Sequence, residues 1–189
     1  MNQRNRQITE GAMRVFSRYG FAKTTMNDIA REAGVARQTL YNAYAGKDEV
    51  LRAAIKENMA NTYDEVIESW AQVNDFGAKL DLLFQHGPLL WYDMVQSSPE
   101  MADMVEGLHT VAKEELAAFA GRCVAAIETE LAPFEGNIIG QDLSVHAMAE
   151  FIYYAAINAK YGVPDRDALV QRLAVLRSSV LATLRVTPG

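Results

Sequence analysis

Apolar residues recur along most of this chain at intervals of three and four, the spacing that lines them up on one face of an α-helix. Ile8, Ala12, Val15, Phe16 and Tyr19 form the first such stripe, and Gly20 follows it as a helix-ending residue. The period-of-two alternation that marks a half-buried strand is hard to find. The pattern therefore predicts an all-α protein. Beyond the N-terminal third we expect helices at roughly 76–97, 99–106, 108–131, 141–161 and 165–185.

Two short helices are predicted between residues 25 and 44. Thr25 and Asp28 form a Thr-x-x-Asp start that resembles a capping box, because the hydroxyl can accept a hydrogen bond from a first-turn backbone N–H. Gly34 ends this helix, and the next one runs over about 36–44. Two short helices joined by a tight turn are typical of a helix-turn-helix, whose second helix enters the major groove of DNA.

The second short helix carries a row of hydrogen-bond donors. Leu40 and Tyr44 are expected to point inward, which leaves the polar residues facing outward. Arg can pair with guanine, Gln with adenine, and Thr can touch a thymine methyl group. Lys47 and Thr25, at the starts of the flanking helices, are placed to hold phosphates beside backbone N–H groups. The predicted base-reading residues are Arg37, Gln38 and Thr39.

Charge is distributed unevenly along the chain. The 189 residues include 18 Lys and Arg against 24 Asp and Glu, a formal net charge of −6, which taken alone argues against nucleic acid as a partner. Residues 1–60 hold ten basic and six acidic residues (+4), whereas residues 61–189 hold eight and eighteen (−10). A basic N-terminal third indicates a region built to meet an anion, although chance variation of helix surfaces gives the same pattern.

The N-terminal motif is similar to that of the TetR family of bacterial transcriptional regulators. The resemblance covers roughly residues 5–56 and is much more specific than a generic helix-turn-helix. It is carried by the residues from Phe21 to Tyr41, by Tyr44, and by Lys47 to Leu51.

The resemblance implies an all-α homodimer of about nine helices. Residues 1–47 would form a three-helix DNA-binding domain and residues 48–189 an effector-binding and dimerisation bundle. Tyr41 and Asn42 would join the phosphate contacts. The implied function is a ligand-responsive regulator, chiefly a repressor, that binds a near-palindromic double-stranded operator and is released by a small-molecule effector. The helix from Lys47 toward Trp70 would link the two parts.

Three positions depart from the family pattern. Ala36 stands where Ser is common, so the recognition helix loses its side-chain cap. Ala43 replaces a common aromatic residue or His, and Gly46 replaces a common Ser. These departures keep an alternative open, in which the chain is an all-α ligand-binding or protein-interaction module whose helix-turn-helix no longer reads DNA.

Aromatic, Met and isolated polar residues are frequent in the later helices. Most of these side chains should be plain core. A ligand pocket is nevertheless apolar with a few placed polar groups, and the mixture favours a neutral or cationic, partly aromatic effector. The residues predicted to line that pocket are Trp91, Tyr92, His109, Tyr154 and Asn158.

The last two predicted helices each carry a stripe of small and medium apolar residues. Such stripes allow close helix approach, and two helices from each subunit could form a four-helix bundle across a two-fold axis. The alternative is that both stripes are buried within their own subunit. The predicted interface consists of Met148, Ile152, Ala155, Ala156, Leu173, Leu176 and Val180.

Other classes of function find little support in the sequence. The three His residues are far apart, with no Cys/His spacing for a metal, no nucleophile–base pair and no phosphate-binding glycine loop. We therefore predict no enzyme activity, cofactor or metal. The single Cys123 excludes an internal disulfide, and no apolar run is long enough to span a bilayer. A cytoplasmic protein is expected.

Overall fold

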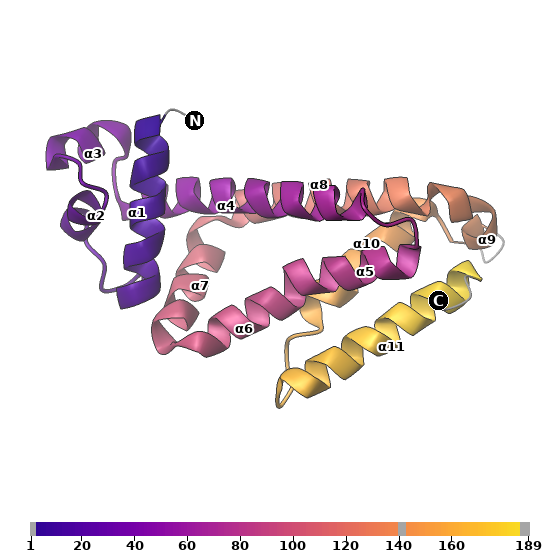
Figure 1. The fold of residues 1–189 in the computed structure, drawn as a ribbon. Helices are drawn as coiled ribbons and strands as arrows, with labels where there is room; N and C mark the ends of the chain where they lie inside the picture. Colours follow the sequence, from indigo (N-terminus) through magenta and orange to yellow (C-terminus); the bar gives the residue numbers. More distant parts are fainter. Residues whose placement is uncertain (1–2, 140–142, 186–189) are drawn as a thin grey trace. The chain divides into compact units, whose positions relative to one another are not determined.

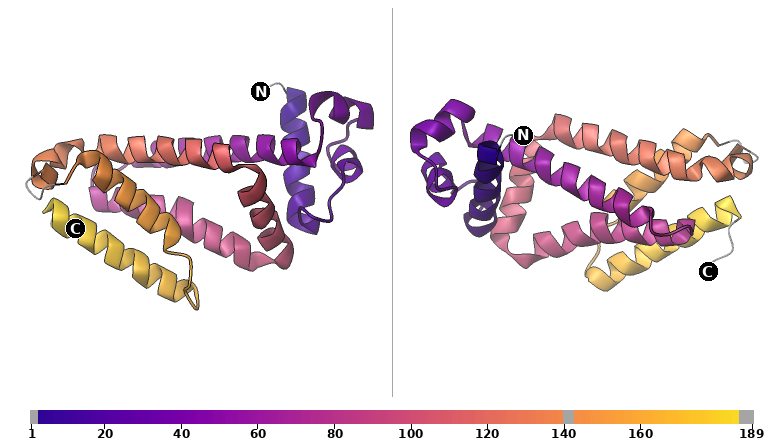
Figure 2. Two further views of the ribbon diagram at one scale, coloured as in Figure 1. Left: turned by 180° about the vertical axis from the view of Figure 1, so that it is seen from behind. Right: turned by 45° about the horizontal axis from the view of Figure 1, so that its top comes forward.

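The computed structural model describes residues 3–139 and 143–185, in which all regular secondary structure is helical (Figures 1 and 2). The predicted all-α class is confirmed. Because α5, η1 and α6 follow one another without a gap, as do α8, η2 and α9, the described residues form nine helical rods, the number that the resemblance implies. The elements are α1 (Gln3–Tyr19), α2 (Met26–Glu32), α3 (Arg37–Ala43), α4 (Lys47–Trp70), α5 (Phe76–Phe84), the π-helical η1 (Gln85–Leu89), α6 (Leu90–Ser97), α7 (Pro99–Val111), α8 (Lys113–Leu131), the 3₁₀ turn η2 (Ala132–Phe134), α9 (Glu135–Ile139), α10 (Val145–Asn158) and α11 (Arg166–Leu184).

The helix break predicted at Gly107 is wrong. Helix α7 continues through Gly107 to Val111, and the break falls at Ala112. A Cβ atom built on Gly107 would lie 2.7 Å from Cδ1 of Phe21, so the glycine allows this helix to approach the Phe21 ring closely. Its role is packing, not helix termination.

The segment predicted as one helix over residues 76–97 is kinked in its middle. Gly87 has non-helical dihedrals (φ −104°, ψ −106°), and Pro88 follows it without a backbone N–H to donate. The backbone hydrogen-bond pattern changes here from α-helical to the wider π-helical pattern of η1. The start of the predicted helix at 141–161 lies outside the described residues, and α10 begins at Val145.

The chain divides into two compact units. The first comprises Met1–Asn61 and Met94–Ala117, and the second Thr62–Asp93 and Ala118–Gly189. This division does not coincide with the predicted boundary at 47/48, because α4 contributes to both units and α7 belongs to the first. In the first unit α1 contacts α2 and α7. Its fully buried side chains include Ile8, Phe16, Ile29, Leu40, Leu51, Met104 and Leu108.

The second unit has its own hydrophobic core, in which α11 contacts α5, α9 and α10. Two ion pairs tie its helices together: Arg177 lies 3.0 Å from Asp81, and Lys79 pairs with Glu130. Among the described residues, no helix is long and apolar enough to cross a membrane.

The two apolar stripes predicted to form a dimer interface lie within this core. Six of the seven residues are buried and Ala155 is half-buried against the same core. The stripes are therefore buried within the chain, as the alternative interpretation of the sequence had it, because α10 and α11 pack against each other and against α5, η1 and α9. The side chains concerned are Met148, Ile152, Ala155, Ala156, Leu173, Leu176 and Val180.

Candidate nucleic-acid interface and effector cavity

A complete capping box opens α2. The Asp28 N–H donates to Oγ1 of Thr25 at 3.3 Å, and the Thr25 N–H donates to the Asp28 carboxylate at 3.1 Å. The Thr25 hydroxyl also donates to that carboxylate at 2.6 Å. These bonds from Thr25 hold the pKa of Asp28 below its usual value, because they stabilise the ionised form. The Thr25 hydroxyl thus serves first as a cap.

The turn between α2 and α3 depends on Gly34. Its φ of +63° lies in the left-handed region, where a side chain would strain the backbone. Gln7 of α1 donates its amide N–H to the carbonyl oxygen of Ala33 at 2.7 Å, which holds the end of α2 against α1. The following helix starts at Ala36 without a side-chain cap, as predicted.

Helix α3 presents a polar outer face. Leu40 is fully buried, and Tyr44, just after the helix, is half-buried, so that desolvation raises its pKa. Among the predicted DNA contacts of α3, Thr39 is half-buried, and the exposed ones are Arg37, Gln38, Tyr41 and Asn42.

Two of these outward residues form a pair. The Gln38 side-chain N–H donates to Oδ1 of Asn42 at 2.8 Å, one helical turn away. This bond leaves Gln38 with a carbonyl acceptor and a second N–H, the two groups that a bidentate contact to adenine requires. Arg37 has no ion-pair or hydrogen-bond partner within the described residues, so its guanidinium is available to an external acceptor.

Lys47 is engaged inside the first unit. Its Nζ donates to the carbonyl oxygens of Phe21 at 2.8 Å, Ala22 at 3.1 Å and Thr24 at 3.3 Å. It also lies 4.6 Å from the centre of the Phe21 ring. Lys47 therefore fixes the turn before α2, a role that the sequence pattern did not reveal.

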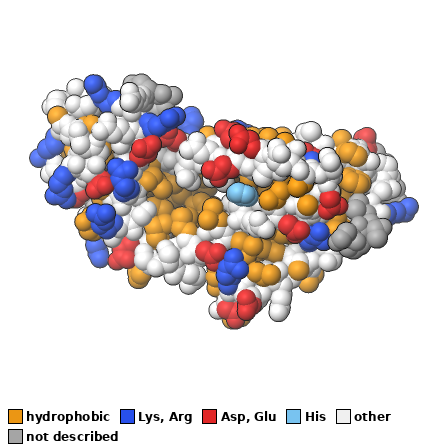
Figure 3. All heavy atoms as spheres, in the orientation of Figure 1, with side chains coloured by type: hydrophobic (Ala, Val, Ile, Leu, Met, Phe, Trp, Pro, Cys, Tyr) orange, Lys and Arg blue, Asp and Glu red, His pale blue; other side chains and the backbone are white. Residues whose placement is uncertain are grey.

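Cationic side chains gather on the helices of the N-terminal region, where Figure 3 shows blue atoms over α1–α3. Some of them are neutralised locally: Arg14 lies 2.8 Å from Glu32, and Arg31 lies 2.9 Å from Asp28. Lys23 is exposed and, like Arg37, has no ion-pair partner in the part of the chain that the structure describes. A local positive field of this kind suits a polyanion.

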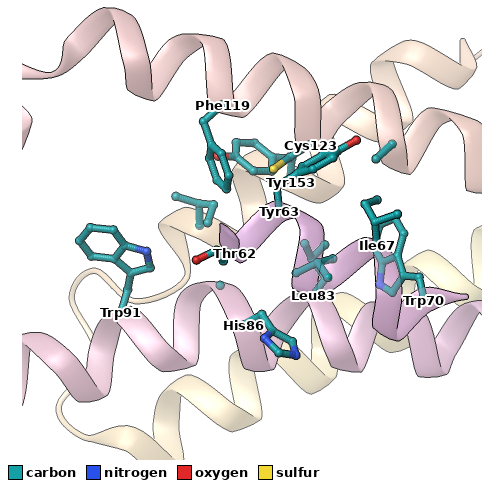
Figure 4. Close-up of a pocket in the computed structure, with 14 residues that line it drawn as sticks. Thr62, Tyr63, Ile67, Trp70, Leu83, His86, Trp91, Phe119, Cys123 and Tyr153 are labelled. Atoms are coloured by element: carbon teal, nitrogen blue, oxygen red, sulfur yellow. The ribbon is translucent and has the colours of Figure 1, made fainter. Parts of the chain in front are cut away.

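The second unit contains a cavity that holds about 520 Å³ of space free of atoms, part of it open to solvent (Figure 4). One wall is α4, which contributes Thr62, Tyr63, Val66, Ile67 and Trp70. The kinked η1 contributes His86 and Gly87, so the interruption of the helix lies at the cavity wall.

Of the five predicted pocket residues, Trp91 lines this cavity. Tyr92 packs against the core of the second unit, while Tyr154 and Asn158 are exposed on α10. His109 is exposed on α7, in the first unit. The α4 residues were missed because that helix was interpreted as a link, and a single-sequence pattern does not distinguish a cavity-facing apolar residue from a core one.

Burial changes the ionisation of two groups at the cavity wall. Desolvation raises the pKa of the Cys123 thiol to about 12 and also raises that of the Tyr153 phenol. Both groups are neutral near pH 7, so the cavity presents neither a thiolate nor a phenolate.

Comparison with known proteins places this arrangement in a family. The family model described as "Bacterial regulatory proteins, tetR family" matches residues 8–54, which include α2 and α3. The uncharacterised HTH-type transcriptional regulator YezE of Bacillus subtilis (strain 168) is 23% identical over 165 residues, 82% of each chain. Residues 8–54 therefore carry the N-terminal helix-turn-helix region of the TetR family of bacterial regulatory proteins. Members of this family are DNA-binding regulators and not enzymes, in agreement with the sequence prediction.

Solved structures share the fold over nearly the whole chain. A TetR-family transcriptional regulator from Pectobacterium atrosepticum superposes with a TM-score of 0.68 at 21% identity, covering 98% of this chain and 95% of that one. Thermus thermophilus FadR, a TetR-family transcriptional repressor solved with lauroyl-CoA, gives a TM-score of 0.53 at 21% identity and covers 98% and 97%.

Proposed function

We propose that this transcriptional regulator is a ligand-responsive repressor that binds a near-palindromic operator as a homodimer in the cytoplasm and is released by a small-molecule effector. The observation that carries the proposal is the exposed donor row of α3, in which Arg37 is unpaired among the described residues and Gln38 is held by Asn42. Thermus thermophilus FadR, which shares the fold of this chain, is itself a transcriptional repressor, and this supports the proposed repressor role.

The proposed DNA contacts follow from this geometry. Arg37, Gln38 and Thr39 read base edges in the major groove. Tyr41 and Asn42 hold phosphates from the same helix, and Asn42 also positions Gln38. Near Thr25 and Lys47 the phosphates are held by other backbone N–H groups in the first turns of α2 and α4, since both side chains and the Thr25 N–H already have partners.

Selection from random DNA duplexes tests the proposal, followed by anisotropy titrations of the selected operator at several salt concentrations. The double variant Arg37→Ala, Gln38→Ala should lose sequence preference while retaining weak, salt-dependent binding. Arg4→Ala is the matched control, an exposed cation of α1 outside the predicted contacts. If the wild-type protein selects no sequence, the repressor proposal fails in favour of a module that no longer reads DNA.

The proposed dimer surface is the outward face of α10 and α11. The stripes predicted from the sequence are covered within the chain, whereas large apolar side chains remain exposed on the opposite faces. Phe151 is 55% exposed and Tyr154 47% on α10, and Val175 is 66% exposed on α11. Small residues surround Val175, with Ala174 and Ser178 both exposed, which allows two helices to approach closely.

The cavity is the proposed effector site, and α4 is the proposed link to DNA. This single helix carries Lys47 at its first residue and five residues of the cavity wall in its second half. An effector can act only if it favours one arrangement of α4 over another. An effector that releases the operator should therefore bind more weakly to the operator-bound protein than to the free one.

A further inference from the structure

The cavity of the second unit is lined without any Lys, Arg, Asp or Glu among the described residues. Five aromatic side chains make up much of the wall: Tyr63, Trp70, Trp91, Phe119 and Tyr153. Figure 4 shows Trp91 at one end, Trp70 with Ile67 at the other, and Phe119, Cys123 and Tyr153 along one side. Flat aromatic faces of this kind favour a ligand that is itself a ring system.

Apart from the imidazole of His86, the polar groups at the wall are hydroxyl, indole and thiol groups, and several of them lack a hydrogen-bond partner within the described residues. The indole N–H of Trp70 is already bonded to the carbonyl oxygen of Lys79 at 2.8 Å, so Trp70 offers only its ring. The indole N–H of Trp91 and the hydroxyl of Thr62 have no hydrogen-bond partner within the described residues. In Figure 4 the nitrogen of Trp91 and the oxygen of Thr62 are turned toward one another. Together they offer one donor and one donor-acceptor to a ligand oxygen.

A cation that packs on the wall residue Tyr63 is already engaged. Arg122 stacks on the ring of Tyr63 at 4.0 Å from its centre and lies 4.0 Å from Asp64. Desolvation keeps the neighbouring Cys123 thiol neutral, as described above. A carboxylate entering the cavity would leave water without gaining a Lys or Arg counter-charge at the wall, which is unfavourable, whereas an ammonium group would be compensated only by cation–π contacts with the rings.

We propose that the cavity takes an uncharged aromatic compound bearing one hydroxyl or carbonyl oxygen, which bonds with Trp91 and Thr62, and that it rejects organic anions, acyl-CoA thioesters included. This proposal rests on the cavity being the effector site and names its ligand class. It sets this chain apart from Thermus thermophilus FadR, which was solved with lauroyl-CoA.

Calorimetric titrations with four probes test the charge preference. 2-Naphthol is the neutral probe, 2-naphthoate and 2-naphthylmethylammonium are charged probes of similar shape, and lauroyl-CoA represents the thioesters. 2-Naphthol should bind at least about tenfold more tightly than either charged naphthalene, and lauroyl-CoA should show no saturable binding. Tighter binding of 2-naphthoate or lauroyl-CoA overturns the proposal. Loss of their binding in Arg122→Gln would identify Arg122 as the cation that receives them.

Two matched variants place the binding in the cavity. Ala126 lines the cavity, whereas its neighbour Ala125 is exposed on the same helix. Ala126→Phe should weaken 2-naphthol binding by about tenfold or more, while Ala125→Phe should leave it within twofold. Helicity measured by circular dichroism shows whether each variant is folded. Equal effects of the two variants overturn the assignment to this cavity.

The hydrogen bond has its own readout. Trp91→Phe keeps a ring but removes the N–H. It should therefore weaken the binding of 2-naphthol by about three- to tenfold and leave the binding of naphthalene, which has no oxygen, nearly unchanged. Equal weakening of both compounds would show that Trp91 contributes only its ring. If 2-naphthol does not bind while the protein still binds its operator, the ligand class is wrong and the repressor proposal stands.

Discussion

Lys47 shows how a fold can use a cation that a sequence motif assigns to DNA. A Lys ammonium group has three N–H donors, and the three carbonyl oxygens of residues 21, 22 and 24 receive all of them. The Phe21 ring adds a cation–π contact on the same side chain. At this position the charge holds the turn that leads into α2, and with it the placement of the helix-turn-helix.

Replacement of Lys47 by Met should therefore lower stability. Met preserves the length of the side chain but leaves the three carbonyl oxygens without their donor, and we expect the free energy of unfolding to fall by about 1.5–3 kcal/mol. Urea denaturation measures this. Lys23→Met, at an exposed cation without an ion-pair partner in the described chain, should change stability by less than about 0.5 kcal/mol. A Lys47→Met protein of unchanged stability but weaker operator binding would instead support the side-chain phosphate contact.

Cys123 provides a second test at the scale of one residue. Burial raises its pKa to about 12, whereas a thiol in an unfolded chain has a pKa of about 8.5. Only the thiolate reacts with Ellman's reagent, so labelling of the native protein at pH 8 should be at least about 100-fold slower than labelling in guanidinium chloride. Because Cys123 is the only cysteine of the chain, the signal is unambiguous. Comparable rates in the two states would show that the thiol is open to solvent.

At the scale of the helix, the packing of α1 on α2 depends on Gly11. A Cβ atom on Gly11 would lie 2.9 Å from the backbone nitrogen and Cα of Ala33, atoms that belong to the end of the helix-turn-helix's first helix. The same region accepts the hydrogen bond from Gln7. The sequence presents Gly11 only as a weak helix former inside a helical stripe. Its necessity comes from the second helix that lies against it.

Gly11→Ala should destabilise the protein although Ala is the better helix former. The clash is with backbone that cannot rotate away, and overpacking of this kind costs about 1–3 kcal/mol. Gly121→Ala is the matched control, since this exposed glycine of α8 has nothing within 4 Å of its Cβ position. That variant should raise the free energy of unfolding by about 0.5–1 kcal/mol. Thermal unfolding measures the stability of both variants. A stabilising effect of Gly11→Ala would contradict the close approach of α1 to the end of α2.

At the scale of the whole molecule, charge and exposed apolar surface are segregated. The basic residues of the N-terminal third give it +4, and the remainder carries −10, so attraction to DNA is confined to the region that holds α3. The large apolar residues left exposed on α10 and α11 lie in the other unit. A protein that reads a two-fold symmetric operator needs both surfaces at once.

Disruption of the proposed dimer surface should yield a folded monomer with weak operator binding. Phe151→Glu combined with Val175→Glu places four charges at a two-fold interface, which we expect to shift the sedimentation coefficient from dimer to monomer at about 10 μM protein. Leu90→Glu, at a side chain that is 51% exposed on α6, is the control and should remain dimeric. A double variant that stays dimeric would exclude this surface, and a monomeric wild-type protein would exclude the dimer itself.

The sequence by itself determined the class of structure and the character of the N-terminal region. The helical spacing of apolar residues, the Thr25–Asp28 box and Gly34 are local signals, and the structure confirms them because capping and turn conformation involve only neighbouring residues. The same holds for the uncapped start of α3 at Ala36.

Only the tertiary structure decided which partner each side chain meets. The apolar stripes of α10 and α11 are compatible with burial against a partner subunit or in the core of their own chain. In the structure they are buried in their own chain, where α11 packs against α5 and both helices pack against α9. Likewise, Trp91 and the α4 residues line a cavity, while Tyr154 is exposed, although all of them occur in helices with the same spacing of apolar residues. Periodicity fixes which residues share a face of a helix, but burial depends on segments far away in sequence. For that reason the helix-turn-helix could be predicted from the sequence, and the residues that line the cavity could not.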